Sequence, residues 1–138
     1  MIRKRREGRR GQAMVELALA LPIFFLIIFG LVDLGRAVYT YNTLSEGARE
    51  GARYGSVQAR AYSPATRATV EAYVMDKLEA VRNPTVVASC TAVGAYGCTV
   101  DDQDVVEAKA DLSMITPIIG QIVGTLHLEA RSEAIVNN

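Results

Sequence analysis

A single apolar run near the N-terminus dominates the pattern of hydrophobic and polar positions. From Ala13 to Val32 the chain has 20 residues, and Glu16 is the only charged residue among them. A helix rises about 1.5 Å per residue, so the run would extend about 30 Å, which is the thickness of a bilayer's hydrocarbon core. The pattern therefore predicts a transmembrane helix, in which Pro22 is tolerated because membrane helices accept a proline bend.

The helical pattern continues beyond the apolar run. Between Asp33 and Arg60 the sequence has no proline, and its apolar residues keep a helical spacing. We expect one helix from Gln12 to Arg60, about 70 Å long, with one half in lipid and the other half projecting outward. Tyr39 and Tyr41, near the membrane end of the outer half, are typical of an interfacial aromatic belt.

Three glycines, Gly47, Gly51 and Gly55, recur at intervals of four residues in the outer half of this helix. Glycine costs about 1 kcal/mol relative to alanine in a helix interior, so the column indicates a face that another element approaches closely. Small residues at this spacing also pack membrane helices, but this column lies beyond the span, so we expect the protein's own second layer as its partner. A loop through this region is the alternative. The charged residues around the column predict a solvated helix face, and they are Glu46, Arg49, Glu50 and Arg53.

After residue 60 the pattern predicts a second helix and then strands. Ser63 and Pro64 are typical of a helix start, and Asn83-Pro84 of its end. Between them an apolar stripe at helical spacing comprises Val70, Tyr73, Val74, Leu78 and Val81. β-Branched content and period-two alternation then predict strands within Thr85–Val93, Asp104–Met114 and Thr125–Val136. The predicted fold class is α+β: a long N-terminal transmembrane helix continues into an ectodomain, where a second helix packs on a small antiparallel sheet of about three strands.

Charge sets the topology of the predicted span. Six basic residues precede the run against the single Glu7, and they are Arg3, Lys4, Arg5, Arg6, Arg9 and Arg10. The positive-inside rule places the N-terminus in the cytoplasm and everything beyond Asp33 outside. We therefore divide the chain into a basic leader (1–11), a transmembrane helix (12–33) and an extracytoplasmic domain (34–138). Without the leader, nine basic and fourteen acidic side chains remain, a net charge of −5 that gives no general attraction to nucleic acid.

The two cysteines, Cys90 and Cys98, both lie beyond the span. An isolated nearby pair in an extracytoplasmic domain predicts a disulfide. A zinc site is the poorer interpretation, because structural zinc needs four ligands and the chain has a single histidine.

The sequence shows no catalytic constellation, so we expect no enzyme, no cofactor and no metal. His127 alternates with Glu129 and Arg131 on the strand face expected to be exposed, which favours a solvated histidine over a catalytic base. The acidic residues 101–104 could offer oxygen ligands to calcium, but they lack the spacing of an EF-hand loop, and a solvated turn is favoured.

Three other interpretations compete for the N-terminal segment. A cleaved signal peptide would use Ala18-Leu19-Ala20, which falls early in the apolar run and leaves the stronger half behind it. A twin-arginine signal would need bulky apolar residues where Gly11-Gln12-Ala13 stands. A plain single-span anchor explains everything except Glu16 and the glycine, Gly11, that joins the basic leader to the apolar run. A carboxylate in a membrane segment calls for a partner.

The junction Arg9-Arg10-Gly11-Gln12-Ala13-Met14-Val15-Glu16 resembles the processing site of type IV prepilins, which a peptidase cuts after a glycine on the cytoplasmic side. The resemblance continues through Gly30-Leu31-Val32-Asp33-Leu34-Gly35-Arg36 and through Ala48-Arg49-Glu50-Gly51-Ala52-Arg53-Tyr54-Gly55. Over roughly residues 9–56 the chain is similar to the TadE-like family, the minor pilins (pseudopilins) of the tight-adherence type IV pilus system.

This resemblance implies a pilin-like fold and a structural role in pilus assembly or initiation and in surface adhesion. It implies cleavage between Gly11 and Gln12 by a prepilin peptidase, and a role for Glu16 in processing or in docking to a neighbouring subunit. The implied partners are the peptidase, other pilin subunits, the assembly platform and the membrane. The implied location is the inner membrane, followed by the surface pilus after assembly. The alternative function is a single-span accessory or binding protein that never enters a filament.

Overall fold

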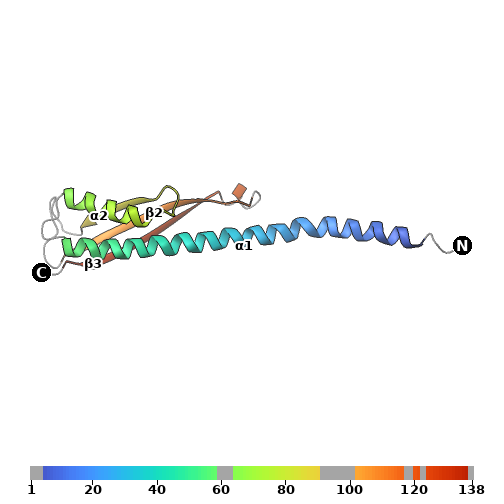
Figure 1. Ribbon diagram of the computed structural model, residues 1–138, viewed down its shortest axis with the longest axis horizontal. Coiled ribbons are helices and arrows are strands. Elements are labelled where there is room, and N and C mark those ends of the chain that lie inside the picture. The colour runs from blue at the N-terminus through green and yellow to red at the C-terminus, as the bar shows by residue number, and fades with distance from the viewer. Residues whose placement is uncertain (1–4, 59–63, 91–101, 117–119, 122–123, 137–138) are drawn as a thin grey trace.

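The computed structural model describes residues 5–58, 64–90, 102–116, 120–121 and 124–136, with backbone alone for residues 5–10 and 64–65. Its most extended element is α1 (Arg5–Gln58), a helix of 54 residues that passes through Pro22. The N-terminal half of α1 projects far beyond the rest of the molecule (Figure 1).

Helix α1 begins seven residues before the predicted start at Gln12, because Arg5 and the residues after it are already helical. Arginine, glutamate and glutamine are good helix formers, and the two glycines in this stretch do not break the helix. The helix ends at Gln58 in the described part of the chain, while the predicted end at Arg60 lies outside it.

The ectodomain adds a second helix and a sheet to the outer half of α1. Helix α2 (Pro64–Lys77) is followed by strands β1 (Thr85–Cys90), β2 (Gln103–Ser113) and β3 (Thr125–Ile135). The strands form an antiparallel sheet in the order β1-β2-β3. The α+β class is confirmed. The second helix ends earlier than Asn83, and the predicted strand residues 91–93 lie outside the described residues.

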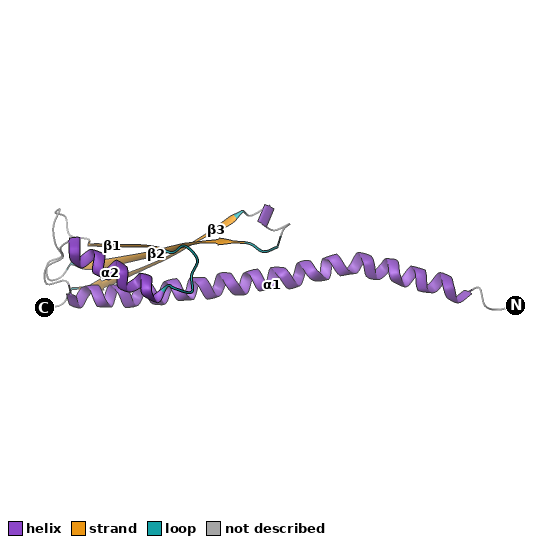
Figure 2. Cartoon of the chain, turned by 45° about the horizontal axis from the view of Figure 1, so that its top comes forward, coloured by secondary structure: helices purple, strands orange, loops and turns teal. Residues whose placement is uncertain are grey.

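Two helices cover one face of the sheet (Figure 2). Leu44, Ala48 and Ala52 of α1 are buried. Val70 and Val74 of α2, together with Leu78 directly after its end, belong to the same core. The sheet contributes the alternating positions of β2 to the same core, namely Val106, Ala108 and Ala110. The predicted helical stripe and the predicted strand alternation therefore both point into one core.

Strand β2 departs from the predicted alternation at one position. Val105, on the face opposite Val106, is only 3 % exposed. β2 is the central strand, with Ser89 of β1 and Glu133 of β3 as the cross-strand neighbours of Val105, so its outer face is flanked on both sides.

Candidate functional site: the projecting helix and its clamp to the ectodomain

The projecting half of α1 exposes apolar side chains on all sides. Met14 is 74 % exposed, Leu19 70 % and Leu31 69 %. By its length and composition, this helix could cross a membrane, which is consistent with a single-pass membrane protein. An apolar surface of this extent is not stable in water, so lipid or other protein chains must cover it.

The predicted processing and docking residues lie at the start of this apolar surface. Gly11, Gln12 and Glu16 are all exposed, and a side chain placed at Gly11 would meet open space. Within the described part of the chain, Glu16 makes no hydrogen bond or ion pair. The roles assigned to these three residues stay predictions.

At the other end of the apolar run, Asp33 holds the ectodomain to α1. Its side chain is 5 % exposed, and its carboxylate accepts hydrogen bonds from the segment that follows β2. The Ile115 amide lies 2.9 Å from Oδ1, the Thr116 amide 2.9 Å from Oδ2, and the Thr116 hydroxyl 2.6 Å from Oδ2. We call this set of contacts the Asp33 clamp.

Arg36 extends the clamp to the end of β2. Its guanidinium lies 3.6 Å from Asp33 Oδ1 and donates a hydrogen bond of 3.4 Å to the Ser113 carbonyl. The sequence prediction treated Asp33 only as the end of the span. The position of this carboxylate at the end of the apolar run could have indicated the clamp, because a buried charge needs hydrogen-bond donors.

The glycine column faces the ectodomain's second layer. All three glycines are buried. A side chain at Gly47 would lie 3.0 Å from Leu78 Cδ2, one at Gly51 would collide with Val74, and one at Gly55 would collide with the Asp104 carboxylate. The backbone of α1 therefore approaches α2 and β2 more closely than any residue with a side chain would allow.

Of the predicted solvated turn at residues 101–104, residue 101 lies outside the described residues, and the prediction is wrong for Asp104. It belongs to β2 and is fully buried, with its carboxylate against the backbone of α1 at Gly55. Strand pairing opposite Ala134 turns the side chain toward the core face, in register with Val106 two residues on. Within the described residues, no three potential metal ligands gather here or elsewhere.

One residue of the charged cluster on α1, the half-exposed Glu50, also contacts α2. The Tyr73 hydroxyl donates a hydrogen bond of 2.5 Å to Glu50, and Lys77 Nζ lies 3.5 Å from the same carboxylate. The Tyr73 hydrogen bond, helped by the Lys77 charge, lowers the pKa of Glu50. Donating that bond raises the pKa of Tyr73, with partial burial adding to the effect. The Tyr54 ring stacks on Tyr73 with centroids 4.4 Å apart.

The outer face of the sheet carries paired charges. His127 is exposed, as predicted, and its Nδ1 lies 2.5 Å from Asp111 Oδ1 on the neighbouring strand. Lys109 Nζ lies 3.1 Å from Glu129 and 3.3 Å from Glu107, and these hydrogen bonds raise the pKa of Lys109. This arrangement is typical of a sheet face in contact with water.

Cys90, at the end of β1, is disulfide-bonded. The other cysteine of the sequence, Cys98, lies outside the described residues. Their pairing therefore stays a prediction.

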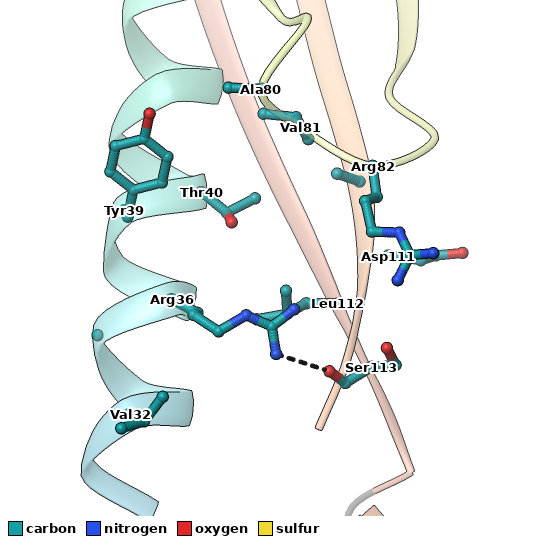
Figure 3. Close-up of a pocket in the computed structure, with 12 residues that line it drawn as sticks. Val32, Arg36, Tyr39, Thr40, Ala80, Val81, Arg82, Asp111, Leu112 and Ser113 are labelled. Atoms are coloured by element: carbon teal, nitrogen blue, oxygen red, sulfur yellow. Dashed lines mark hydrogen bonds between the residues drawn. The ribbon is translucent and has the colours of Figure 1, made fainter. Parts of the chain in front are cut away.

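A groove of about 470 Å³ opens beside the clamp (Figure 3). Residues 32–40 of α1 form one wall, and residues 110–113 of β2 together with residues 80–82 form the other. Arg36 reaches across it from α1 to Ser113.

Comparison with known proteins gives one positive result. Residues 11–53 match the family model described as TadE-like protein. No curated protein and no solved structure matches the chain significantly. The match includes Gly11, Glu16, Asp33 and the first two glycines of the column. It agrees with the resemblance drawn from the sequence: residues 11–53 are similar to TadE-like proteins.

Proposed function

We propose that the protein is a structural minor pilin of a tight-adherence type IV pilus, processed by a prepilin peptidase. The observation that carries the proposal is the exposed apolar half of α1, joined as one continuous helix to a small folded ectodomain. Such a helix is stable in lipid before assembly and against the helices of other subunits afterwards, because both environments bury its side chains. The family match supports an association with this pilus system.

The proposal places the N-terminus in the cytoplasm and the ectodomain outside, in accord with the basic leader. Cleavage after Gly11 removes the leader and creates a new α-amino group at Gln12. A neighbouring subunit's Glu16 then accepts a charge-assisted hydrogen bond from that group, which compensates the cost of a carboxylate near the hydrocarbon region. The paired charges of the outer sheet face remain in contact with water.

Processing is tested by co-expressing the full chain with a prepilin peptidase and measuring the mass of the product. We expect a chain that begins at Gln12. Gly11→Val should block the cut, since the peptidase must approach the backbone there, whereas Gly8→Val in the same leader is the matched control. A retained leader, or a start after Ala20, would contradict the pilin assignment.

Assembly is tested by recovery of the chain in sheared surface filaments. Glu16→Ala should leave membrane insertion intact or improve it, while reducing recovery with the filament. Glu16→Gln should be intermediate, because it keeps an acceptor without the charge. Glu46→Gln, at an exposed glutamate of the outer half of α1, is the control. A chain that stays in the membrane in every case would instead indicate a single-span accessory protein.

A further inference from the structure

The groove beside the clamp combines apolar and cationic lining residues. Val32, Val81 and Leu112 give it apolar lining, and Arg36 and Arg82 add cationic groups from opposite walls. Val32 is the last residue of the apolar run, so the groove continues directly from the surface that the proposed function places in lipid. A ligand with an apolar part and an anionic part would match this combination of lining residues.

The charges around the groove leave the arginines available to such a ligand. Arg36 uses one nitrogen for Asp33 and Ser113, and the Asp33 oxygens already accept hydrogen bonds from Ile115 and Thr116. A guanidinium has five donors, so further ones remain. On the opposite wall, Arg82 is exposed and forms no ion pair with another described residue.

One carboxylate lines the groove as well. Asp111 Oδ1 lies 2.5 Å from His127 Nδ1, so this carboxylate has a partner on the neighbouring strand. The aromatic Tyr39 lines the α1 wall and is 60 % exposed, as expected for a side chain at the level of lipid headgroups.

We propose that this groove binds the headgroup of an anionic phospholipid from the leaflet on the ectodomain side. Arg36 and Arg82 hold the phosphate, since guanidinium groups bind phosphate oxygens with paired hydrogen bonds. The acyl chains lie along α1 from Val32 toward the middle of the bilayer. Inorganic phosphate would leave the apolar lining unused, and this favours a lipid as the source of the anion. The inference rests on the membrane placement in the proposed function.

The test is native mass spectrometry of the full chain, purified in detergent and supplied with phosphatidylglycerol or with phosphatidylcholine. We expect retention of phosphatidylglycerol in preference to phosphatidylcholine. Arg82→Gln, which breaks no hydrogen bond or ion pair among the described residues, should weaken retention about fivefold, the effect expected for one cationic side chain at an anionic surface. Arg36→Gln should act in the same direction, and Arg49→Gln, at an exposed arginine farther along α1, should have no effect.

Gly35 offers a steric test that leaves the charges unchanged. It lines the groove, and a side chain placed there meets open space for at least 4 Å. Gly35→Leu should therefore fold normally and exclude the lipid, while Gly35→Ala should retain it. Amide exchange at Ile115 and Thr116 checks that the Asp33 clamp is intact in each variant.

Equal retention of the two lipids, or retention unchanged in both Arg82→Gln and Gly35→Leu, would overturn the lipid site. Competition by soluble glycerophosphate as effective as by phosphatidylglycerol would also overturn it, by showing a site for free anions. A chain that fractionates with membranes and is cleaved after Gly11 but retains no lipid would contradict this inference alone. A chain absent from membranes would contradict the proposed function itself.

Discussion

At the scale of single residues, the packing of α1 against the ectodomain depends on three positions that have no side chain. The space at each glycine is closed by a different kind of neighbour: the flexible end of Leu78 at Gly47, the stiff Val74 at Gly51, and the buried Asp104 carboxylate at Gly55. A leucine methyl group can move by rotation, whereas a valine has one strongly preferred rotamer in a helix. The tolerance of the three sites should therefore differ.

We predict a graded loss of stability on adding a methyl group to the column. Gly51→Ala should lower the free energy of unfolding by about 1–3 kcal/mol, the usual cost of overpacking a core. Gly47→Ala should cost less and Gly55→Ala more, because the latter displaces a buried carboxylate. Gly35→Ala is the control, since nothing lies near its added methyl group, and it should stabilise α1 by up to about 1 kcal/mol.

Urea unfolding of the full chain in detergent, followed by circular dichroism, measures these differences. If Gly51→Ala and Gly55→Ala were as stable as Gly35→Ala, the close approach of α1 to the ectodomain would be wrong.

The Glu50–Tyr73 pair predicts how stability depends on pH. Glu50 has a lowered pKa in the folded state, so its contribution is present above its ordinary value of 4.5 and is lost as the pH falls through the lowered value. Tyr73 has a raised pKa, so its contribution is present below its ordinary value of 10.0 and is lost as the pH rises through the raised value.

Tyr73→Phe should therefore lower the free energy of unfolding at neutral pH. It should also make that free energy fall less steeply at acidic and at alkaline pH. Tyr41→Phe, at an exposed tyrosine of α1, should not change the pH dependence of stability. Denaturation midpoints measured across this range decide the matter, and parallel curves for the parent and Tyr73→Phe would show that the pair does not couple to folding.

At the scale of elements, the Asp33 clamp fixes the end of the β2–β3 hairpin to the point where α1 leaves its apolar run. Three donors converge on one carboxylate, two of them backbone amides. An asparagine has a single acceptor oxygen, and its NH₂ group would face a donor. The clamp thus requires the charge as well as the shape of Asp33.

Asp33→Asn should therefore open the clamp without unfolding the core. The expected result is faster amide exchange at Ile115 and Thr116, with little change at Ala108 in the middle of the sheet. Thr116→Val should produce a smaller effect and Thr116→Ser almost none, because serine keeps the hydroxyl. Asp76→Asn on exposed α2 is the control. Unchanged exchange in Asp33→Asn would show that the hairpin end is held by packing instead.

The contacts of the Asp33 clamp could not be predicted from the sequence, whereas the core positions could. Periodicity predicts the α2 stripe and the inward positions of β2 and β3, because the spacing of apolar residues is set locally by the helix and the strand. Asp33 and Thr116 are 83 residues apart, and no local pattern relates them. The burial of Asp104 has the same origin, since a carboxylate beside two other acidic residues gives no sign that a glycine of α1 will cover it.

At the scale of the whole molecule, the two halves of α1 have separate tasks. All of the buried core residues of α1 lie from Leu44 onward, and the projecting half contributes no side chain to that core. Asp33 is the last residue toward the N-terminus that is buried against the ectodomain. The apolar run and the folded domain therefore meet at the Asp33 clamp, and the domain should fold without the apolar run.

Two truncations test this division. A chain of residues 30–138 keeps Asp33 and should be a soluble, folded monomer, because removing the apolar run removes the surface that needs lipid. A chain of residues 34–138 also lacks residues 30–33, and with them the clamp carboxylate. It should keep the same denaturant slope, since the same core unfolds, but with a lower midpoint and with faster exchange at Ile115 and Thr116. If neither chain folds, the core needs the apolar half of α1. If both unfold at the same midpoint, Asp33 does not join the two halves.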